Sequence, residues 1–269
     1  LVTEGRAAPA EILAITFMER AAHEMKLRIA RVFSERGMNS HLRDLEHAYL
    51  GTIHSFCARI LKEHPLEARV DPEFRVLDEN EANLLKDTVL SQLIETQFQD
   101  PGLFNLLRIY SEDGLRKSIL SVRDAAQAPS DPLLAAAQEA DLIQTAFSKF
   151  ALEFAHRYSE AKAQRALLDF NDLERKAVDL LSGAEPHSKA IRKWYREKFK
   201  FVLVDEFQDT SPPQDSLISS VSREDNVFVV GDWKQSIFGF RRADAGLILK
   251  KENEAAQEGK GGRVPLVEN

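Results

Sequence analysis

Four apolar residues followed at once by two carboxylates are the feature that most constrains this chain. The run Phe201–Val204 leads directly into Asp205 and Glu206. An unbroken apolar run of this length is typical of a strand buried on both faces, although periodicity alone leaves a buried helix open. Ligands of parallel α/β sheets gather at the carboxyl ends of strands, where one carboxylate can hold Mg²⁺ and another can orient a water. A strand that runs into an acidic, solvated loop explains the same pair equally well.

Two further apolar runs predict buried strands that also end in polar groups. The run 11–17 ends at Thr16 and Phe17, and the run 226–232 ends at Asp232. Because parallel strands end at a shared edge, we expect all three strand ends on one rim of a sheet. A strand end and a core aromatic explain Thr16 and Phe17 without any function.

Helical periodicity follows the first run. An apolar stripe over 22–33 predicts a helix that stops near Gly37. A second stripe, over 53–61, predicts a helix that Thr52 is suited to cap. His54, taken alone, is better explained as a surface or hydrogen-bonded histidine than as a functional one.

The middle of the chain carries a mostly helical pattern. Asp78 and Glu81 form a capping-box pair, and a long helix is predicted from Leu133 to Leu167. A helical stretch of about a hundred residues is too long for a simple crossover between strands. We therefore predict a helical insertion over 66–165 within an α/β parallel-sheet domain made of 1–65 and 166–269.

Composition limits the possible partners. The net charge is −7, so overall charge does not predict binding to nucleic acid, and any such binding must use local groups. The segment 192–200 interleaves basic and aromatic residues, which can bind nucleic acid, but a solvated helix face is the simpler explanation. No apolar run approaches the eighteen or so residues that span a bilayer, so no membrane partner is expected. The single cysteine, Cys57, fits a reducing, cytoplasmic location.

Five segments together resemble the UvrD/Rep-type superfamily 1 DNA helicases, near the AddA/RecB branch. They occur in the family's order and read ILAITFMERAAHEM, TIHSFCARIL, LLDFNDLE, VLVDEFQDTSPPQ and VVGDWKQSIFGFRRAD. DEFQDT followed by GD-x-KQSI-x-x-FR is a highly specific combination, and the branch rests on LDFNDLE and KQSI. The resemblance implies a RecA-like parallel-sheet motor core, with the helical middle where these helicases insert their 1B subdomain.

The resemblance also implies roles for individual residues. Asp205 would coordinate Mg²⁺, Glu206 would activate the hydrolytic water, and Gln235 would sense the γ-phosphate of ATP. The residues implied to contact single-stranded DNA are Thr16, Phe17, Thr52, His54, Phe238, Phe240 and Arg241. Base stacking on aromatic faces tolerates any sequence, which suits a translocating motor.

The implied function is that of an ATP-dependent helicase or translocase that moves 3′ to 5′ on single-stranded DNA in repair or recombination. The implied partners are single-stranded DNA, the remaining helicase domains 2A and 2B, and a nuclease or second recombination subunit. The 269 residues contain no G-x-x-x-x-G-K-[ST] loop, which cradles nucleotide phosphates. In the family this loop lies upstream of the ILAITF match. We therefore expect a fragment of the first motor domain that binds ATP and Mg²⁺ weakly and hydrolyses ATP negligibly by itself.

Two other function classes fit parts of the sequence. A non-motor module that binds single-stranded DNA or has a regulatory role would use the aromatic segment without the nucleotide site. A metal-dependent nuclease would use clustered carboxylates, for which the candidates are Asp205, Glu206, Asp209 and Asp232. A phosphate-sensing glutamine has no role in such a nuclease.

Overall fold

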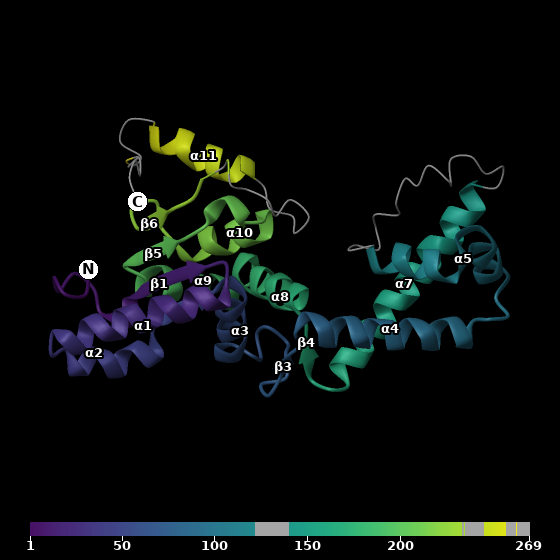
Figure 1. Cartoon of the computed structure of the whole chain (residues 1–269), viewed down its shortest axis with the longest axis horizontal. Coiled ribbons are helices and arrows are strands. Elements are labelled where there is room, and N and C mark those ends of the chain that lie inside the picture. The colour runs from purple at the N-terminus through teal and green to yellow at the C-terminus, as the bar shows by residue number, and fades with distance from the viewer. Residues whose placement is uncertain (122–139, 233, 235–244, 257–261, 263–269) are drawn as a thin grey trace. The chain divides into compact units, whose positions relative to one another are not determined.

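The computed structural model describes residues 1–121, 140–232, 234, 245–256 and 262 of this chain (Figure 1). It divides into two compact units. The first consists of Leu1–Pro72 and Asn171–Asn269, and the second consists of Glu73–Phe170.

Four parallel strands form the centre of the first unit, in the order β2-β1-β5-β6. Their bounds are Ile12–Thr16 for β1, Tyr49–Thr52 for β2, Phe201–Val204 for β5 and Val227–Val229 for β6. The three predicted strands are all present, and their carboxyl ends share one edge because they pair in parallel. This confirms the predicted α/β fold with a parallel sheet.

The strands of this sheet differ in their burial. Strand β1 is buried at all five residues. The prediction that β5 is buried on both faces is wrong in part, since Phe201 and Leu203 are only half-buried. Strand β6 was also predicted to be buried, yet its Phe228 is 54% exposed. Strand β6 lies at an edge of the four-stranded sheet, a position that a local apolar run does not reveal.

Helices cover both faces of this sheet. Their bounds are η1 Pro9–Glu11, α1 Glu19–Glu35, α2 Asn39–Asp44, η2 Leu45–His47, α3 Ile53–Glu63, α8 Phe170–Ser182, α9 Pro186–Lys198, η3 Phe207–Asp209, α10 Pro212–Val221 and α11 Ala245–Ala256. On one face Ala14 and Leu50 pack with Met25 and Ile29 of α1. On the other face the ring of Tyr49 contacts aromatic residues of α3 and α9.

The predicted helix signals of the first unit are confirmed. Helix α1 ends two residues before Gly37, which has a φ of +66°. Thr52 caps α3, because its side-chain oxygen accepts a hydrogen bond from Ser55 N at 3.3 Å. The apolar stripe of α3 is buried, and burial raises the pKa of the Cys57 thiol, with a further contribution from the charge of Glu174.

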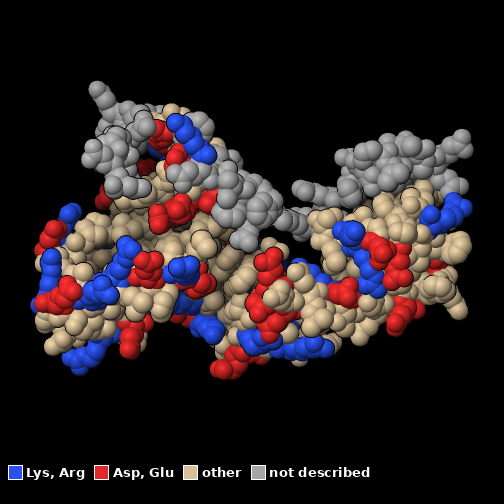
Figure 2. Space-filling model, viewed as in Figure 1, with Lys and Arg blue, Asp and Glu red and all other residues tan. Residues whose placement is uncertain are grey.

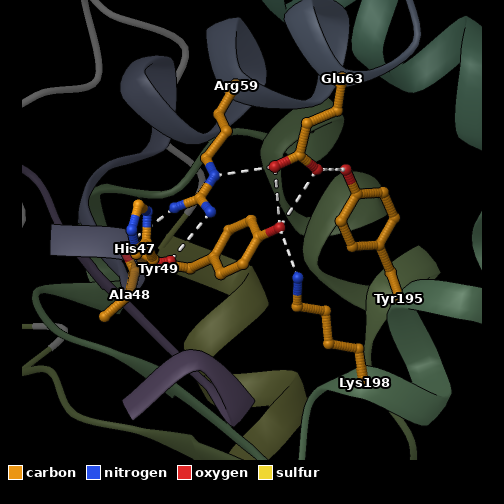
Figure 3. Close-up of polar contacts among 7 residues, drawn as sticks. All are labelled: His47, Ala48, Tyr49, Arg59, Glu63, Tyr195 and Lys198. Carbon is orange, nitrogen blue, oxygen red and sulfur yellow. Dashed lines mark hydrogen bonds and ion pairs between the residues drawn. The ribbon is translucent and has the colours of Figure 1, made fainter. Parts of the chain in front are cut away.

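A carboxylate at the end of α3 joins three elements of this unit (Figure 3). Glu63 accepts hydrogen bonds from the hydroxyls of Tyr49 and Tyr195, at 2.9 and 2.6 Å, and from Arg59 Nε at 2.9 Å. Lys198 Nζ donates to the Tyr49 hydroxyl at 2.8 Å. Burial alone would raise the pKa of Glu63, but the hydrogen bonds from Tyr195, Arg59 and Tyr49 outweigh burial and lower it.

The second unit is built mainly from helices. Their bounds are α4 Glu79–Thr96, α5 Pro101–Ser121, with a kink at Ser111, and α7 Ala140–Ala163. The capping box of Asp78 and Glu81 at the start of α4 is confirmed. The apolar faces of α4, α5 and α7 meet in one core, whose fully buried members include Leu90, Leu93 and Leu106.

The predicted helix from Leu133 to Leu167 is wrong at its carboxyl end. Helix α7 ends at Ala163, and Ala166 adopts a positive φ of 50°. Leu167 and Leu168 then form a short strand, β4, which pairs in parallel with β3, Arg75–Val76. The second unit is therefore not entirely helical, because a backbone turn that the apolar pattern does not mark redirects the chain.

A buried ion pair lies where β4 leads toward α8. Lys162 Nζ is 2.7 Å from Asp169 Oδ2, and the Tyr158 hydroxyl donates to the same oxygen at 3.0 Å. Asp169 directly precedes α8, and these contacts place its carboxylate in the ion pair. None of the helices described is long and apolar enough to cross a membrane.

Candidate functional site

The acidic pair lies directly after β5, on the rim formed by the carboxyl ends of the strands. Asp205 N donates to Ile15 O at 2.9 Å, which extends the pairing with β1 by one residue. Glu206 N donates to Asp205 Oδ1 at 3.0 Å. Glu206 has a φ of +51°, which is uncommon for any residue except glycine and often marks a functional turn. Both side chains are exposed, as carboxylates that bind a metal ion or a water must be.

A buried glutamine joins this pair to the loop after β6. Gln208 is 2% exposed, and its Nε2 donates to Glu206 Oε2 at 2.6 Å. Its Oε1 accepts a hydrogen bond from Asp232 N at 3.0 Å. Both ends of one amide are thus used to hold Glu206 at a fixed place relative to the carboxyl end of β6. Sequence reasoning gave Gln208 no role, because nothing in the local pattern shows which residues it will meet.

Asp209 is the other carboxylate of this segment, and it is buried. Its Oδ1 has no hydrogen-bond partner in the part of the chain that the structure describes. Burial raises the pKa of the Asp209 carboxyl, and the charge of Glu206 raises it further. Asp209 therefore keeps its proton to a higher pH than an ordinary aspartate does.

Close contact between the loop after β6 and η3 depends on Gly231. A Cβ at this position would collide with Gln208 Oε1 and with Ile248 Cδ1, and would lie 3.1 Å from the Gln208 backbone nitrogen. Only glycine lets the chain pass this close to Gln208. The position of Asp232 N on the Gln208 amide therefore depends on the absence of a side chain at residue 231.

Two threonines end the neighbouring strands β1 and β2. Thr16 and Thr52 are paired in register, and both are buried. The Thr16 hydroxyl donates to Met18 O at 3.1 Å, and the Thr52 hydroxyl donates to Glu19 Oε1 at 2.7 Å. Phe17 is half-buried. These bonds stabilise the rim, and the predicted contacts of these residues with DNA stay predictions.

His54, the second residue of α3, lies against a carboxylate from a distant segment. His54 Nε2 is 3.0 Å from Glu174 Oε1, which also accepts a hydrogen bond from Gln214 Nε2 at 2.5 Å. The contact joins α3, α8 and α10. Glu174 is the last residue of the LLDFNDLE segment. The sequence pattern predicted no role for Glu174 itself. His54 is hydrogen-bonded, as its simpler explanation required, and its predicted contact with DNA stays a prediction.

The remaining predicted site residues lie outside the described residues. They are Gln235, Phe238, Phe240 and Arg241. The described chain reaches Asp232, and Lys234 N donates to Asp232 Oδ1 at 3.0 Å.

The carboxylates of the rim do not form the cluster that a metal-dependent nuclease needs. Among the residues that the structure describes, no three histidine, cysteine, aspartate or glutamate side chains are placed to hold one metal ion. Asp205, Glu206, Asp209 and Asp232 are all among those residues. A magnesium ion that is bound chiefly by substrate phosphates and water needs only one or two protein carboxylates, and Asp205 can supply one.

Comparison with known proteins identifies a protein family that this chain matches. The family described as the UvrD/REP helicase N-terminal domain matches residues 1–256. The chain is 37% identical over 162 residues to an ATP-dependent helicase/nuclease subunit of Ligilactobacillus salivarius, which covers 58% of this chain and 13% of that protein. It is 24% identical to the protein of the same name from Bacillus licheniformis, over 93% of this chain and 33% of that protein.

A third relative is the ATP-dependent DNA helicase PcrA of Staphylococcus aureus. It is 27% identical over 256 residues, which cover 94% of this chain and 31% of that protein. The chain therefore spans about a third or less of the length of the curated relatives it matches.

Proposed function

Because the chain belongs to the UvrD/REP helicase N-terminal domain family, we propose that it is part of the first motor domain of an ATP-dependent DNA helicase that moves 3′ to 5′ on single-stranded DNA. The first unit would be the RecA-like motor domain 1A, and the second would be the inserted 1B subdomain. DNA repair or recombination is the proposed setting, and the proposed partner is a nuclease or a second recombination subunit. The names of two relatives, which describe parts of a helicase/nuclease, support that partner class.

The observation that carries this proposal is the Gln208 amide, which binds Glu206 on one side and Asp232 N on the other. Glu206 would accept a proton from the attacking water, and Gln208 would hold its carboxylate in the orientation that this requires. The predicted phosphate sensor Gln235 follows Asp232 by three positions in the sequence. A displacement of Asp232 on nucleotide binding would therefore change the position of the Gln208 amide, and with it the orientation of the Glu206 carboxylate.

Asp205 is suited to the proposed role of magnesium ligand. It is exposed at the rim, and Mg²⁺ in nucleotide sites takes one or two carboxylates together with phosphates and waters. When bound, Mg²⁺ would neutralise negative charge on the phosphates of ATP.

Binding of DNA would depend on local groups rather than on net charge. Acidic and basic side chains are interspersed over the face drawn in Figure 2. The proposed contacts are Thr16, Phe17, Thr52 and His54 on the rim, together with the aromatic residues Phe238 and Phe240 and the cation Arg241. Stacked bases contribute about 1–3 kcal/mol each whatever their identity.

Fluorescence anisotropy with a labelled single-stranded oligonucleotide tests the DNA site. Phe238→Ala and Phe240→Ala should each weaken binding about tenfold, which corresponds to the loss of one stacked base. Phe228→Ala removes a 54% exposed phenylalanine from β6 and is the matched control, with affinity unchanged. Unchanged affinity in both test variants would contradict the proposed aromatic track.

Hydrolysis by this chain alone is proposed to be negligible, because its 269 residues contain no phosphate-binding G-x-x-x-x-G-K-[ST] loop. The measurement is phosphate release from ATP with and without single-stranded DNA. Robust turnover that DNA stimulates would overturn this part of the proposal. A second candidate is a non-motor module that binds single-stranded DNA or regulates such binding. The two candidates differ in a longer chain that includes the loop, where only the motor hydrolyses ATP and Glu206→Gln lowers kcat by about 10²–10⁴.

A further inference from the structure

A row of cations lies on the solvent side of α9. Lys189, Arg192, Lys193 and Arg196 occur at helical spacing on one face, and Ile191 and Tyr195 pack into the unit on the opposite face. Arg223 joins this row from the loop after α10, and the five cations and Glu197 line a hollow of about 550 Å³. In a chain of net charge −7 this is a local concentration of positive charge.

The arginines of this row are held by backbone carbonyls. Arg196 Nε and Nη2 donate to Ser220 O and Ser219 O at 3.0 and 3.1 Å. Arg192 Nη1 donates to Leu181 O at 2.7 Å. Because carbonyls are neutral, these bonds fix the guanidinium groups and leave their charge available.

Arg223 is anchored in the same way, at the end of α9. It donates to Phe199 O at 3.1 Å and also to Arg196 O. Its Nε lies 3.2 Å from Asp225 Oδ1, whose side chain is 78% exposed. Lys193 Nζ lies 3.7 Å from Glu197 Oε1, and both side chains are largely exposed. Such exposed pairs contribute little, so the hollow keeps a net positive charge.

The hollow lies away from the rim that carries Asp205. Helix α9 ends at Lys198, just before β5 starts at Phe201, and Arg223 lies shortly before β6 starts at Val227. The carboxyl end of α9 and Arg223 are therefore at the amino ends of the strands, whereas the acidic rim is at their carboxyl ends. The hollow is not part of the proposed motor site.

We propose that this hollow binds the sugar-phosphate backbone of a nucleic acid. Lys189 and Arg196 are about 10 Å apart along the helix axis at 1.5 Å per residue, a span that corresponds to about three phosphate steps of one strand measured along the axis of a duplex. Guanidinium groups match phosphate oxygens in geometry, and ammonium groups add point charges. The lining residues are all charged, and five of the six are cations, which suits a polyanion such as the sugar-phosphate backbone. The inference does not depend on ATP chemistry or on the aromatic segment.

The test is the salt dependence of binding by the double variant Lys189→Gln/Lys193→Gln of the whole chain. These lysines are chosen because the arginines also anchor the fold. Fluorescence anisotropy with labelled single-stranded and duplex oligonucleotides, from 50 to 200 mM salt, should show about tenfold weaker binding at the lowest salt. The slope of log K against log salt should become less steep by about 1.4–1.8, the value for two lost phosphate contacts.

The matched control removes two exposed cations from another helix, in the variant Lys26→Gln/Arg31→Gln on α1, and should leave the affinity and the slope unchanged. Equal losses in both double variants would show a bulk charge effect and overturn the proposal. Unchanged DNA binding by Lys189→Gln/Lys193→Gln would overturn it too. If this variant lost binding to a labelled polyglutamate peptide but kept its binding to DNA, the hollow would be assigned to an acidic protein instead. Phe238→Ala and Phe240→Ala test the proposed motor site separately, so either proposal can fail while the other stands.

Discussion

Glu63 shows how one partly buried carboxylate can hold three elements together at the scale of single residues. Its partners come from β2, α3 and α9, and two of them are tyrosine hydroxyls. Burial raises the pKa of Tyr49 and of Tyr195, and the charge of Glu63 adds to both shifts. Both tyrosines therefore stay protonated and continue to donate to Glu63 at any ordinary pH.

Glu63→Gln should lower the free energy of unfolding by about 1.5–3 kcal/mol at pH 7, because hydrogen bonds to a charged acceptor become bonds to a neutral one. The pKa of Glu63 is lowered in the folded state, so its contribution is present above the ordinary value of 4.5 and is lost as the pH falls through the lower folded value. Urea unfolding at pH 7 and at pH 3 measures this.

The difference between Glu63→Gln and the unmodified chain should shrink at the lower pH. Glu24→Gln is the control, since Glu24 pairs with Arg28 on the exposed surface of α1 and should change stability by less than about 0.5 kcal/mol. A difference that is the same at both pH values would show that the charge of Glu63 is not the cause.

At the scale of elements, the close approach of the β6 loop to η3 decides the geometry of the rim. Phe207 N donates to Val230 O at 2.8 Å, and Asp232 N donates to Gln208 Oε1. Gly231 lies between these two contacts and leaves no room for a side chain. The elements β5, η3 and β6 therefore behave as one connected segment around the Gln208 amide.

Gly231→Ala should lower the free energy of unfolding by about 1–3 kcal/mol, since the new methyl group must displace Gln208 or Ile248 in a packed interior. Thermal and urea unfolding measure the loss. Gly114→Ala is the matched control. It lies within α5, where a Cβ would meet Ser111 Oγ at 3.4 Å, and alanine favours a helix over glycine by up to about 1 kcal/mol. A neutral Gly231→Ala would mean that the loop can move away from Gln208 at little cost.

At the scale of the whole molecule, the second compact unit has an apolar core of its own. The buried residues of α4, α5 and α7 form one cluster with Leu77 and Leu167, all within Glu73–Phe170. The strands β3 and β4 pair near the two ends of this segment. A unit with its own core and paired ends is expected to fold without the rest of the chain.

The segment 73–170, produced separately, should show helical circular dichroism and one cooperative thermal transition. Leu93→Ala in this segment should lower its free energy of unfolding by about 2–5 kcal/mol, because Leu93 is fully buried. Leu84→Ala is the control, since Leu84 is 71% exposed on the same helix. A segment without a cooperative transition would show that the second unit needs the first in order to fold.

The features that the sequence predicted correctly are those that depend on near neighbours. The Thr52 cap, the capping box of Asp78 and Glu81 and the stop near Gly37 each involve residues only a few positions apart. The errors occur where contacts between distant segments determine the local structure. Strand β6, which carries the exposed Phe228, is placed by its pairing with β5, and Leu167 and Leu168 leave the predicted helix to pair with Arg75 and Val76 of β3.

The sequence by itself determined the α/β class, the three runs that become parallel strands, and the family, because apolar runs, turn residues and motif letters are local properties of the chain. Only the tertiary structure decided that Gln208 holds Glu206, that Glu174 meets His54, and that five cations gather around one hollow. The physical reason is distance along the chain. Tyr195 and Glu63 are 132 positions apart, and a hydrogen bond between them exists only after the sheet has brought α3 and α9 together.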